Sequence, residues 1–333
     1  MLNDTSRIRI SKSFSIFFAA TTAPVGGGAN PNPSYLSAGK WMSLIRANFL
    51  VLTVVSVLTG FSAAIYERCP FNAVNALLAL VGALFAHISA NVFNNYFDYK
   101  MGVDQMTVKT PFSGGVDVLV KGHIRPSTAF LFGLCCLLGA ALVGIYFVRI
   151  FFWPMLAIVV YGGLSIYFYT PYLSRLHGVS EIIAGTNFGL MGLGAYVTQT
   201  GLISATALSV FVPVSILVGM LLFLNEFPDI EADRSAGRRH LMLLLGRKMA
   251  SRLYVLLLVS VYISIVLPVL MGVTPLSSMI ALATGPLAWT AGRIVVKSYD
   301  KIDSLARAMA LNVLIVLGTT ALISLGLLLG IFL

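Results

Sequence analysis

An all-α, polytopic membrane protein is the fold class that this sequence predicts, and three observations support it. Of the 333 residues, 58% are apolar and only 10% are charged, whereas soluble domains are about one quarter charged. The mean hydropathy is +0.91. Apolar runs of spanning length recur along the chain, and they are continuous rather than alternating, which favours helices over membrane strands.

The first 40 residues differ from the rest of the chain, because they are polar, lightly basic and rich in Ser, Gly, Pro and Asn. The apolar run 14–20 is shorter than the roughly 20 residues that a membrane helix needs, and it resembles a signal-peptide core only weakly. We predict that residues 1–40 form a flexible cytoplasmic tail, with a cleaved presequence as the alternative. Residues 41–333 are predicted to form the membrane domain.

Nine apolar runs follow the tail, and each is long enough to predict one transmembrane helix. The predicted spans are 44–66, 74–97, 127–148, 150–169, 178–200, 208–226, 252–272, 276–296 and 306–332.

The basic residues predict how these helices are oriented. If the spans alternate in direction, the tail shares one side with the connections 98–126, 170–177, 227–251 and 297–305. Of the 22 Lys and Arg residues, only Arg68 and Arg149 fall on the other side. Because Lys and Arg concentrate in cytoplasmic loops, we expect a protein of the cell membrane with its N-terminus in the cytoplasm and its C-terminus outside. These loops also account for the net charge of +10, so no nucleic-acid partner is predicted.

Polar oxygens recur at helical spacing at the ends of two of these runs. Asn225, Asp229 and Asp233 are spaced four residues apart, so on a helix their side chains line one face. Asn94 and Asp98 repeat this spacing at the end of the second span. Carboxylates at a membrane boundary are costly without a cation or polar ligand.

The two acidic stretches occupy equivalent places in the chain, because four spans separate them. This pattern predicts two four-helix units plus a ninth helix around a central cavity. The loops 98–126 and 227–251 are predicted to be the cytoplasmic catalytic loops, with their acidic faces meeting across that cavity.

Carboxylate and amide oxygens are hard ligands that suit Mg²⁺, which commonly bridges carboxylates to substrate phosphates. Gly102 is predicted to end the first helix, so that Asp104 folds back towards Asp98. Pro228 is predicted to kink or loosen the second helix beside Asp229. The candidate Mg²⁺ ligands are Asn94, Asp98, Asp104, Asn225, Asp229 and Asp233.

Basic side chains near both stretches could clamp phosphate oxygens. The segment Thr110–Gly115 could add backbone N–H donors in an anion-binding nest. Metal, clamp and apolar cavity together suit the departure of a diphosphate from a long hydrophobic chain. The candidate diphosphate-binding residues are Lys100, Lys109, Lys121, Arg125, Arg238 and Arg239.

These motifs resemble those of the UbiA-type intramembrane prenyltransferases. The resemblance is carried by Asn94-Asn95-x-x-Asp98 with Asp104, and by Asn225-x-x-x-Asp229-x-x-x-Asp233 four spans later. The amino-acid sequences of the loops are similar to those of the branch that contains the 1,4-dihydroxy-2-naphthoate prenyltransferases of menaquinone biosynthesis. The similar segments are Asn94–Lys100, Thr110–Gly115 and Glu226–Asp233, followed by Gly237-Arg238-Arg239. The resemblance covers about residues 40–333.

The resemblance implies a nine-helix fold and a Mg²⁺-dependent transfer of a polyprenyl group from its diphosphate to an aromatic acceptor, with dihydroxynaphthoate expected. Three departures from the family pattern leave the ligand set open. Asn95 stands where Asp is frequent, Gly102 lies four residues after Asp98, and His240 replaces the usual Thr. The residues predicted to be catalytic are Asp98, Asp229, Lys109 and Arg239.

Several polar residues inside the spans are candidates for the prenyl or acceptor pocket. His87, Asn187 and Tyr169 are predicted to line it, and ordinary core or helix-packing roles are the alternative. Glu181 is either an interfacial charge or a base beside the acceptor. Glu226 is less well phased with the proposed metal-binding face.

Two further classes of function remain open. The same fold could use another acceptor, such as a glycerol-phosphate lipid, homogentisate, a chlorophyll-type alcohol or a haem vinyl group. Alternatives without prenyl transfer are a cation-coupled transporter and a non-catalytic protein that binds prenyl lipids. Transporter sites lie near the bilayer midplane, whereas these carboxylates are at its edge. The predicted partners are therefore polyprenyl diphosphate, an aromatic acceptor and the lipid bilayer.

Overall fold

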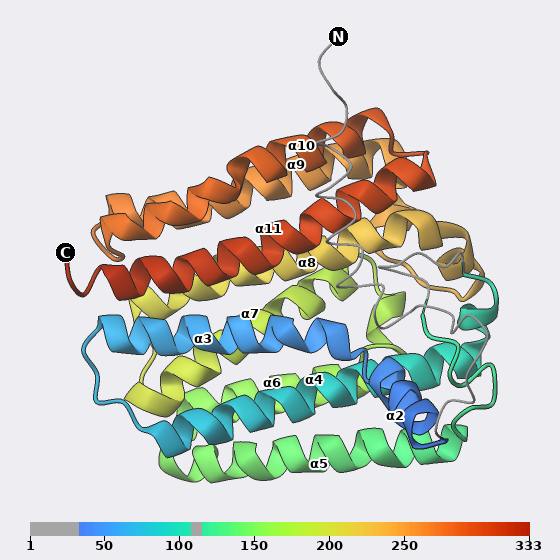
Figure 1. Ribbon diagram of the computed structural model, residues 1–333, viewed down its shortest axis with the longest axis horizontal. Helices are drawn as coiled ribbons and strands as arrows, with labels where there is room; N and C mark the ends of the chain where they lie inside the picture. The colour runs from blue at the N-terminus through green and yellow to red at the C-terminus, as the bar shows by residue number, and fades with distance from the viewer. Residues whose placement is uncertain (1–32, 108–114) are drawn as a thin grey trace.

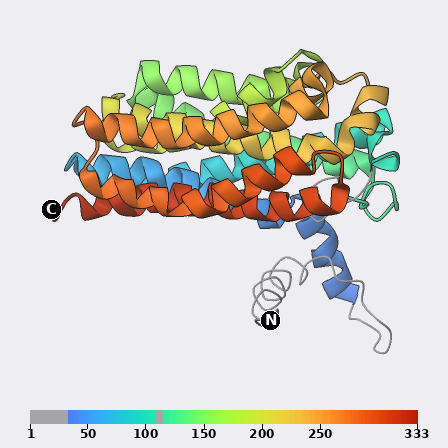
Figure 2. The same ribbon diagram turned by 90° about the horizontal axis from the view of Figure 1, so that it is seen from above.

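The computed structural model describes residues 33–107 and 115–333, and the regular secondary structure of these residues is entirely helical. Long helices lie side by side and form one bundle (Figure 1). The end of α4, the end of α8 and the short helix α2 gather at one end of the bundle, and the C-terminus lies at the other. Seen from above, α2 projects away from the bundle (Figure 2).

The helices follow one another along the chain, and the longest connection between them, residues 102–125, joins α4 to α5. They are α2 (Pro33–Leu44), α3 (Leu50–Tyr66), α4 (Ala73–Met101), α5 (Pro126–Ile150), α6 (Phe152–Phe168), α7 (Val179–Thr200), α8 (Ala205–Ser235), α9 (Leu241–Leu270), α10 (Gly285–Lys297) and α11 (Ile302–Leu329). In the described part of the chain they are accompanied by the 3₁₀ helices η1 (Ala47–Phe49), η2 (Val103–Gln105), η3 (Leu173–Arg175) and η4 (Leu276–Thr284).

Within residues 33–107 and 115–333, seven helical stretches are long and apolar enough to cross a membrane, which makes this an integral membrane protein. They are η1 with α3, α4, α5, α8, α9, η4 with α10, and α11. The predicted ranges 150–169 and 178–200 are also helical, as α6 and α7. Helix α6 is apolar but only 17 residues long.

Several boundaries differ from the prediction, and α9 begins at Leu241, well before the predicted span 252–272 and inside the predicted loop 227–251. Residues 33–40, expected in the flexible tail, belong to α2, whereas residues 1–32 lie outside the described part of the chain. Helix α4 continues past residue 97 to Met101, and α8 continues past residue 226 to Ser235. Asp98, Asp229 and Asp233 therefore lie on helices, and Asp104 lies on the 3₁₀ segment 103–105 that follows α4.

Helix α8 continues through Pro228, where a kink or loosening was predicted, and ends at Ser235. A proline inside a helix removes one hydrogen bond and clashes with the preceding turn. Leu224 and Phe227 are completely buried beside it, and the packing of these side chains offsets that cost. The helical spacing of the oxygens on α8 is therefore kept as far as Asp233.

Helices α3, α7 and α8 approach one another closely through glycines. A Cβ atom on Gly60 of α3 would lie 1.9 Å from the carbonyl oxygen of Gly192 in α7. A Cβ atom on Gly185 of α7 would lie 2.2 Å from the carbonyl oxygen of Ser215 in α8. Small residues let membrane helices pack backbone to backbone, so α7 is fixed against the acidic helix α8.

Candidate active site

A cavity of about 1290 Å³ lies among α2 and α4–α8. The acidic ends of α4 and α8 form one part of its wall, with Asp98 and Asp229 among the lining residues. Small and apolar side chains such as Ala83, Gly144 and Ile158 line the part among the helices. One cavity thus combines a strongly polar region with an apolar space large enough for a hydrocarbon chain.

The first acidic stretch ends α4 as the sequence predicts. Gly102 adopts φ +74°, a left-handed conformation that ends the helix after Met101. The following 3₁₀ helix η2 carries Asp104, which is only 4% exposed and lines the same cavity as Asp98. Asp104 and Asp98 thus lie at the wall of one cavity.

Arg46, which the sequence analysis did not single out, reaches into this acidic region from the turn before α3. One of its terminal nitrogens donates to Asn94 Oδ1 at 2.8 Å and to Asn95 Oδ1 at 2.7 Å. Its backbone has φ +50°, a strained conformation for a residue with a side chain, and such strain tends to mark functional positions. Burial lowers the pKa of Arg46 from its ordinary value, although Asp98 and Asp104 oppose this change.

Asn95 has a structural role that explains why an aspartate would not replace it. Its Nδ2 donates to the carbonyl oxygen of Leu44 at 2.8 Å, while its Oδ1 accepts from Arg46. The side chain is completely buried. A carboxylate could accept from Arg46, but it has no proton to donate to Leu44 when ionised. Asn95 therefore holds the turn that carries Arg46.

Arg238 joins the two acidic stretches. Its guanidinium forms ion pairs with Asp98 of α4 and with Asp233 Oδ1 of α8, the latter at 2.7 Å. Burial disfavours the charged guanidinium, but Asp98 and Asp233 outweigh burial and raise the pKa of Arg238 above its ordinary value. The other oxygen of Asp233 lies 2.9 Å from Nε2 of His240. The two acidic faces thus meet at Arg238, as the sequence predicts.

The oxygen atoms of this region fit a hard divalent cation such as Mg²⁺. Asn225 Oδ1 and Asp229 Oδ1 are buried, and neither has a hydrogen-bond partner within residues 33–107 and 115–333. Such orphaned oxygens are costly unless a ligand satisfies them. Asp98 and Asp104 line the same cavity, so amide and carboxylate oxygens come from both stretches. Asn94 Oδ1 already accepts from Arg46, so it would share this oxygen with a cation.

Most of the predicted phosphate-binding cations lie away from the cavity wall. Lys100 is exposed above the ring of Tyr96, and Lys121 pairs with Asp117 at 2.8 Å. Arg125 and Arg239 are exposed. Lys109 and most of the predicted anion-binding nest fall outside the described residues. Arg46 and Arg238 are the two arginines that line the cavity in the described part of the chain.

The three predicted pocket residues all line the cavity. His87 is buried, its Nδ1 lies 2.7 Å from the hydroxyl of Thr53, and its ring contacts Phe188 edge-on. Asn187 accepts a hydrogen bond from Ser165 at 2.9 Å. Tyr169 follows directly after the end of α6. Their side chains are available to a ligand inside the cavity.

The sequence of this chain is similar to those of known proteins. Residues 53–314 match the family model described as "UbiA prenyltransferase family". The chain is also similar to 1,4-dihydroxy-2-naphthoate octaprenyltransferase of Bacillus subtilis (strain 168). The two are 30% identical over 233 residues, which is 69% of this chain and 73% of the Bacillus protein.

Solved structures share the fold. A UbiA homolog from Aeropyrum pernix K1 in its apo form superposes with a TM-score of 0.65 at 19% identity, over 83% of this chain and 97% of that protein. A UbiA homolog from Archaeoglobus fulgidus bound to GPP and Mg²⁺ gives a TM-score of 0.58 at 17% identity, over 86% and 99% of the two chains.

Proposed function

This chain belongs to the UbiA prenyltransferase family, and from this membership we propose that it transfers a polyprenyl group from polyprenyl diphosphate to 1,4-dihydroxy-2-naphthoate. The observation that carries the proposal is Arg238, which pairs with Asp98 and Asp233 from two separate helices beside an apolar cavity. Cations and carboxylates held together in this way suit a metal-bound diphosphate, and the apolar space suits its hydrocarbon chain.

We place the diphosphate between the acidic ends of α4 and α8. Mg²⁺, when bound by the six proposed ligands, supplies positive charge to the leaving diphosphate. Arg238 is positioned to donate hydrogen bonds to the same oxygens, because its guanidinium already lies between Asp98 and Asp233. Arg46 adds a second buried cation beside Asn94. In the relative from Archaeoglobus fulgidus, GPP and Mg²⁺ are bound together.

The reaction breaks the bond between the first prenyl carbon and the diphosphate oxygen, whose electrons leave with the diphosphate. A ring carbon of the acceptor then forms a bond to the allylic carbon, and the proton on that ring carbon passes to the leaving diphosphate or to water. Residues such as Ala83, Gly144 and Ile158 line the space in which the prenyl chain lies and keep water from the cationic carbon. Tyr169 and His87 are proposed to contact the reacting groups.

We assign dihydroxynaphthoate as the acceptor because of the named Bacillus relative and the loop motifs. Glycerol-phosphate lipids, homogentisate and chlorophyll-type alcohols are the competing acceptors. We also propose that nine helices cross the membrane as two four-helix units plus α11. The N-terminus, the tail and the acidic helix ends then face the cytoplasm, and the C-terminus lies outside.

Prenyl transfer by the purified protein tests this function. The assay contains liposomes, Mg²⁺, a series of polyprenyl diphosphates and a panel of the four acceptor classes. We expect product with dihydroxynaphthoate, and a loss of about a thousandfold in kcat for Asp98→Asn and Asp229→Asn. Glu231→Gln is the matched control, because Glu231 lies on the same helix as Asp229 but its side chain is 73% exposed. It is expected to keep full activity.

Each outcome has a distinct meaning. Product with a different acceptor would retain the reaction and replace the acceptor. Diphosphate release without any prenylated product would support only the first step, ionisation of the prenyl diphosphate, and would contradict transfer to these acceptors. No diphosphate chemistry with any acceptor would refute the proposal in favour of a transporter or a prenyl-lipid binder.

Gly115→Ala should weaken the binding of prenyl diphosphate through Asp104. A Cβ atom at position 115 would lie 2.0 Å from Asp104 Oδ1, so the carboxylate must move. We expect KM for the diphosphate to rise about tenfold, the effect of moving one metal-bound carboxylate. Gly122→Ala is the control, because Gly122 has φ +66°, close to the +68° of Gly115, with no atom within 4 Å of its Cβ position. Equal effects of the two variants on KM would contradict a role for Asp104.

A further inference from the structure

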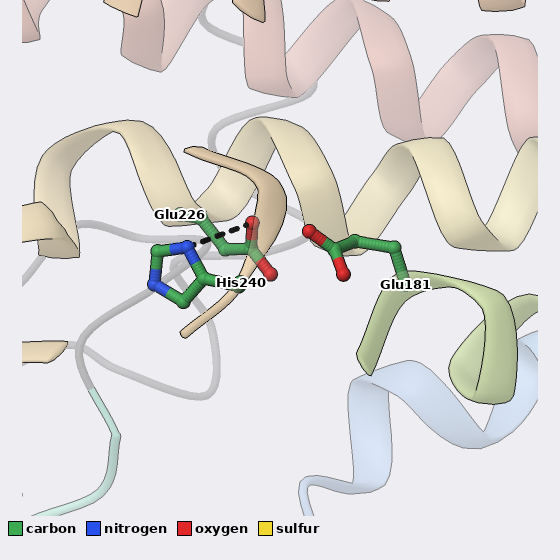
Figure 3. Close-up of side chains that lie close together, drawn as sticks. All are labelled: Glu181, Glu226 and His240. Atoms are coloured by element: carbon green, nitrogen blue, oxygen red, sulfur yellow. Dashed lines mark ion pairs between the residues drawn. The ribbon is translucent and has the colours of Figure 1, made fainter. Parts of the chain in front are cut away.

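A second group of metal-binding side chains lies beside the proposed Mg²⁺ site. Glu181 of α7, Glu226 of α8 and His240 at the start of α9 point towards one another (Figure 3). One ligand atom from each lies within 4.8 Å of the other two. Their exposed fractions are 6%, 5% and 3%, so water does not shield the charges.

Two atoms of this group have no hydrogen-bond partner in the described part of the chain. These are Glu226 Oε2 and His240 Nδ1, both buried. They face each other at 3.4 Å (Figure 3). Zinc binds His nitrogen and carboxylate oxygen at about 2.1 Å with tetrahedral geometry, which sets the two ligand atoms about 3.4 Å apart. The pair is thus spaced as two ligands of one ion.

The surroundings hold two of the three ligands, His240 and Glu181, in place. The second ring nitrogen of His240 lies 2.9 Å from Asp233 Oδ2, the carboxylate–histidine contact that orients metal-binding imidazoles. Glu181 Oε1 accepts the backbone N–H of Leu241 at 2.7 Å, and its Oε2 accepts from Ser180 at 2.6 Å. Each of these oxygens keeps a lone pair for a cation.

The two buried carboxylates of this group also favour a bound cation. Arg238 forms its ion pairs with Asp98 and Asp233. Among the described residues, Glu226 has an ion-pair contact with His240 only, and Glu181 has none. Two buried carboxylates facing each other must share a proton or bind a metal ion. An imidazole ligand favours a transition metal over Mg²⁺.

We propose that Glu181, Glu226 and His240 bind one Zn²⁺ ion, separate from the Mg²⁺ that accompanies the diphosphate. Glu226 and His240 also line the cavity, so the fourth position is open to water or to a ligand oxygen. The ion joins α7, α8 and the start of α9. By fixing His240 it also fixes Asp233, the carboxylate that positions Arg238. This inference does not depend on the proposed reaction.

Metal analysis of the full-length protein tests the site. The protein is purified in detergent without a histidine tag and without chelators, dialysed against Zn²⁺, and passed over a desalting column. Elemental analysis should find about one zinc per chain, and X-ray absorption should show nitrogen and oxygen neighbours at about 2.0 Å without sulfur. Removing the zinc with a chelator should lower the melting temperature, and adding Zn²⁺ should restore it.

Variants separate this site from its neighbours. Glu226→Gln and His240→Gln should lose the zinc, whereas Asp98→Asn, in the proposed Mg²⁺ site, should keep it. His123→Gln is the control for surface binding, because His123 is exposed. Less than one zinc per two chains in the wild-type protein, or zinc unaffected by both cluster variants, would overturn the proposal. A zinc-free protein in which Glu226→Gln retains full stability would identify a shared proton instead.

Discussion

Arg238→Met is expected to lower kcat for prenyl transfer by about a thousandfold, the loss seen when a principal donor to a developing oxyanion is removed. Arg238 forms ion pairs with Asp98 and Asp233, and its side chain is 16% exposed. Methionine keeps much of the volume but none of the charge. The two carboxylates then remain buried without their cation, which costs about 3–5 kcal/mol, so the melting temperature should also fall.

The loss of activity can be separated from the loss of stability. In the double variant Asp98→Asn/Arg238→Met, one of the two uncompensated carboxylates is gone, so the melting temperature should partly recover while activity stays absent. Arg238→Lys keeps the charge, but a lysine cannot donate to two carboxylates through a planar fork. Its activity should lie between the wild type and Arg238→Met. Because Asp98→Asn alone is expected to lose activity, the double variant reports on stability only. A wild-type kcat in Arg238→Met, measured well below its melting temperature, would show that Arg238 acts only on stability.

Arg239→Gln is the informative comparison with Arg238. The sequence places two arginines side by side and offers no means of choosing between them, so both were predicted to bind diphosphate. In the structure Arg238 lies between two carboxylates, whereas Arg239 is exposed and its backbone N–H donates to Ser174. We expect at most a fewfold change in KM, since exposed charges are screened by water.

The helical architecture was largely predictable because hydropathy belongs to each residue, so a long apolar run can be recognised without knowing how the chain folds. Every predicted apolar range overlaps a helix of the structure. The ends of α4 and α8 lie beyond the predicted ends of these spans because polar residues mark the membrane boundary and not the end of a helix. Helix formation instead continues to Gly102 in α4 and through Pro228 in α8. Propensity at a single residue was overruled there by burial of its neighbours.

The acidic part of the site was predictable from spacing, whereas its partners were not. Oxygens four residues apart share a helix face whatever surrounds the helix. Arg46 contacts Asn94 across 48 positions of sequence, and nothing in its neighbourhood distinguishes it from other basic residues that flank a span. Its positive φ is also invisible in the sequence. The glutamate–histidine cluster likewise depends on α7, α8 and α9 meeting, which no local pattern encodes.

Asp229→Asn is expected to affect stability in opposite directions with and without Mg²⁺ and diphosphate. Asp229 and Asp233 carry like charges four residues apart on α8, which destabilises a helix, and Asp229 Oδ1 is buried without a hydrogen-bond partner in the described residues. In a chelator, removing this charge should raise the melting temperature by about 2 °C, for roughly 1 kcal/mol. The same change removes a proposed ligand, so stabilisation by Mg²⁺ and a non-reactive diphosphate analogue should vanish.

The two changes in melting temperature, one in a chelator and one with Mg²⁺ and the analogue, together distinguish a cation-binding carboxylate from a structural one. At a concentration one hundred times Kd, ligand stabilises the wild-type protein by about 2.7 kcal/mol, so its melting curve should cross that of the variant as ligand is added. Glu231→Gln should show neither effect, because its exposed carboxylate pairs only with Arg234 at 3.3 Å among the described residues. A structural Asp229 would instead lower the melting temperature when replaced, in chelator and in Mg²⁺ alike. Such a result would mean that the carboxylate stabilises the fold by itself, and the Mg²⁺ ligands would have to be sought among the remaining oxygens of the cavity.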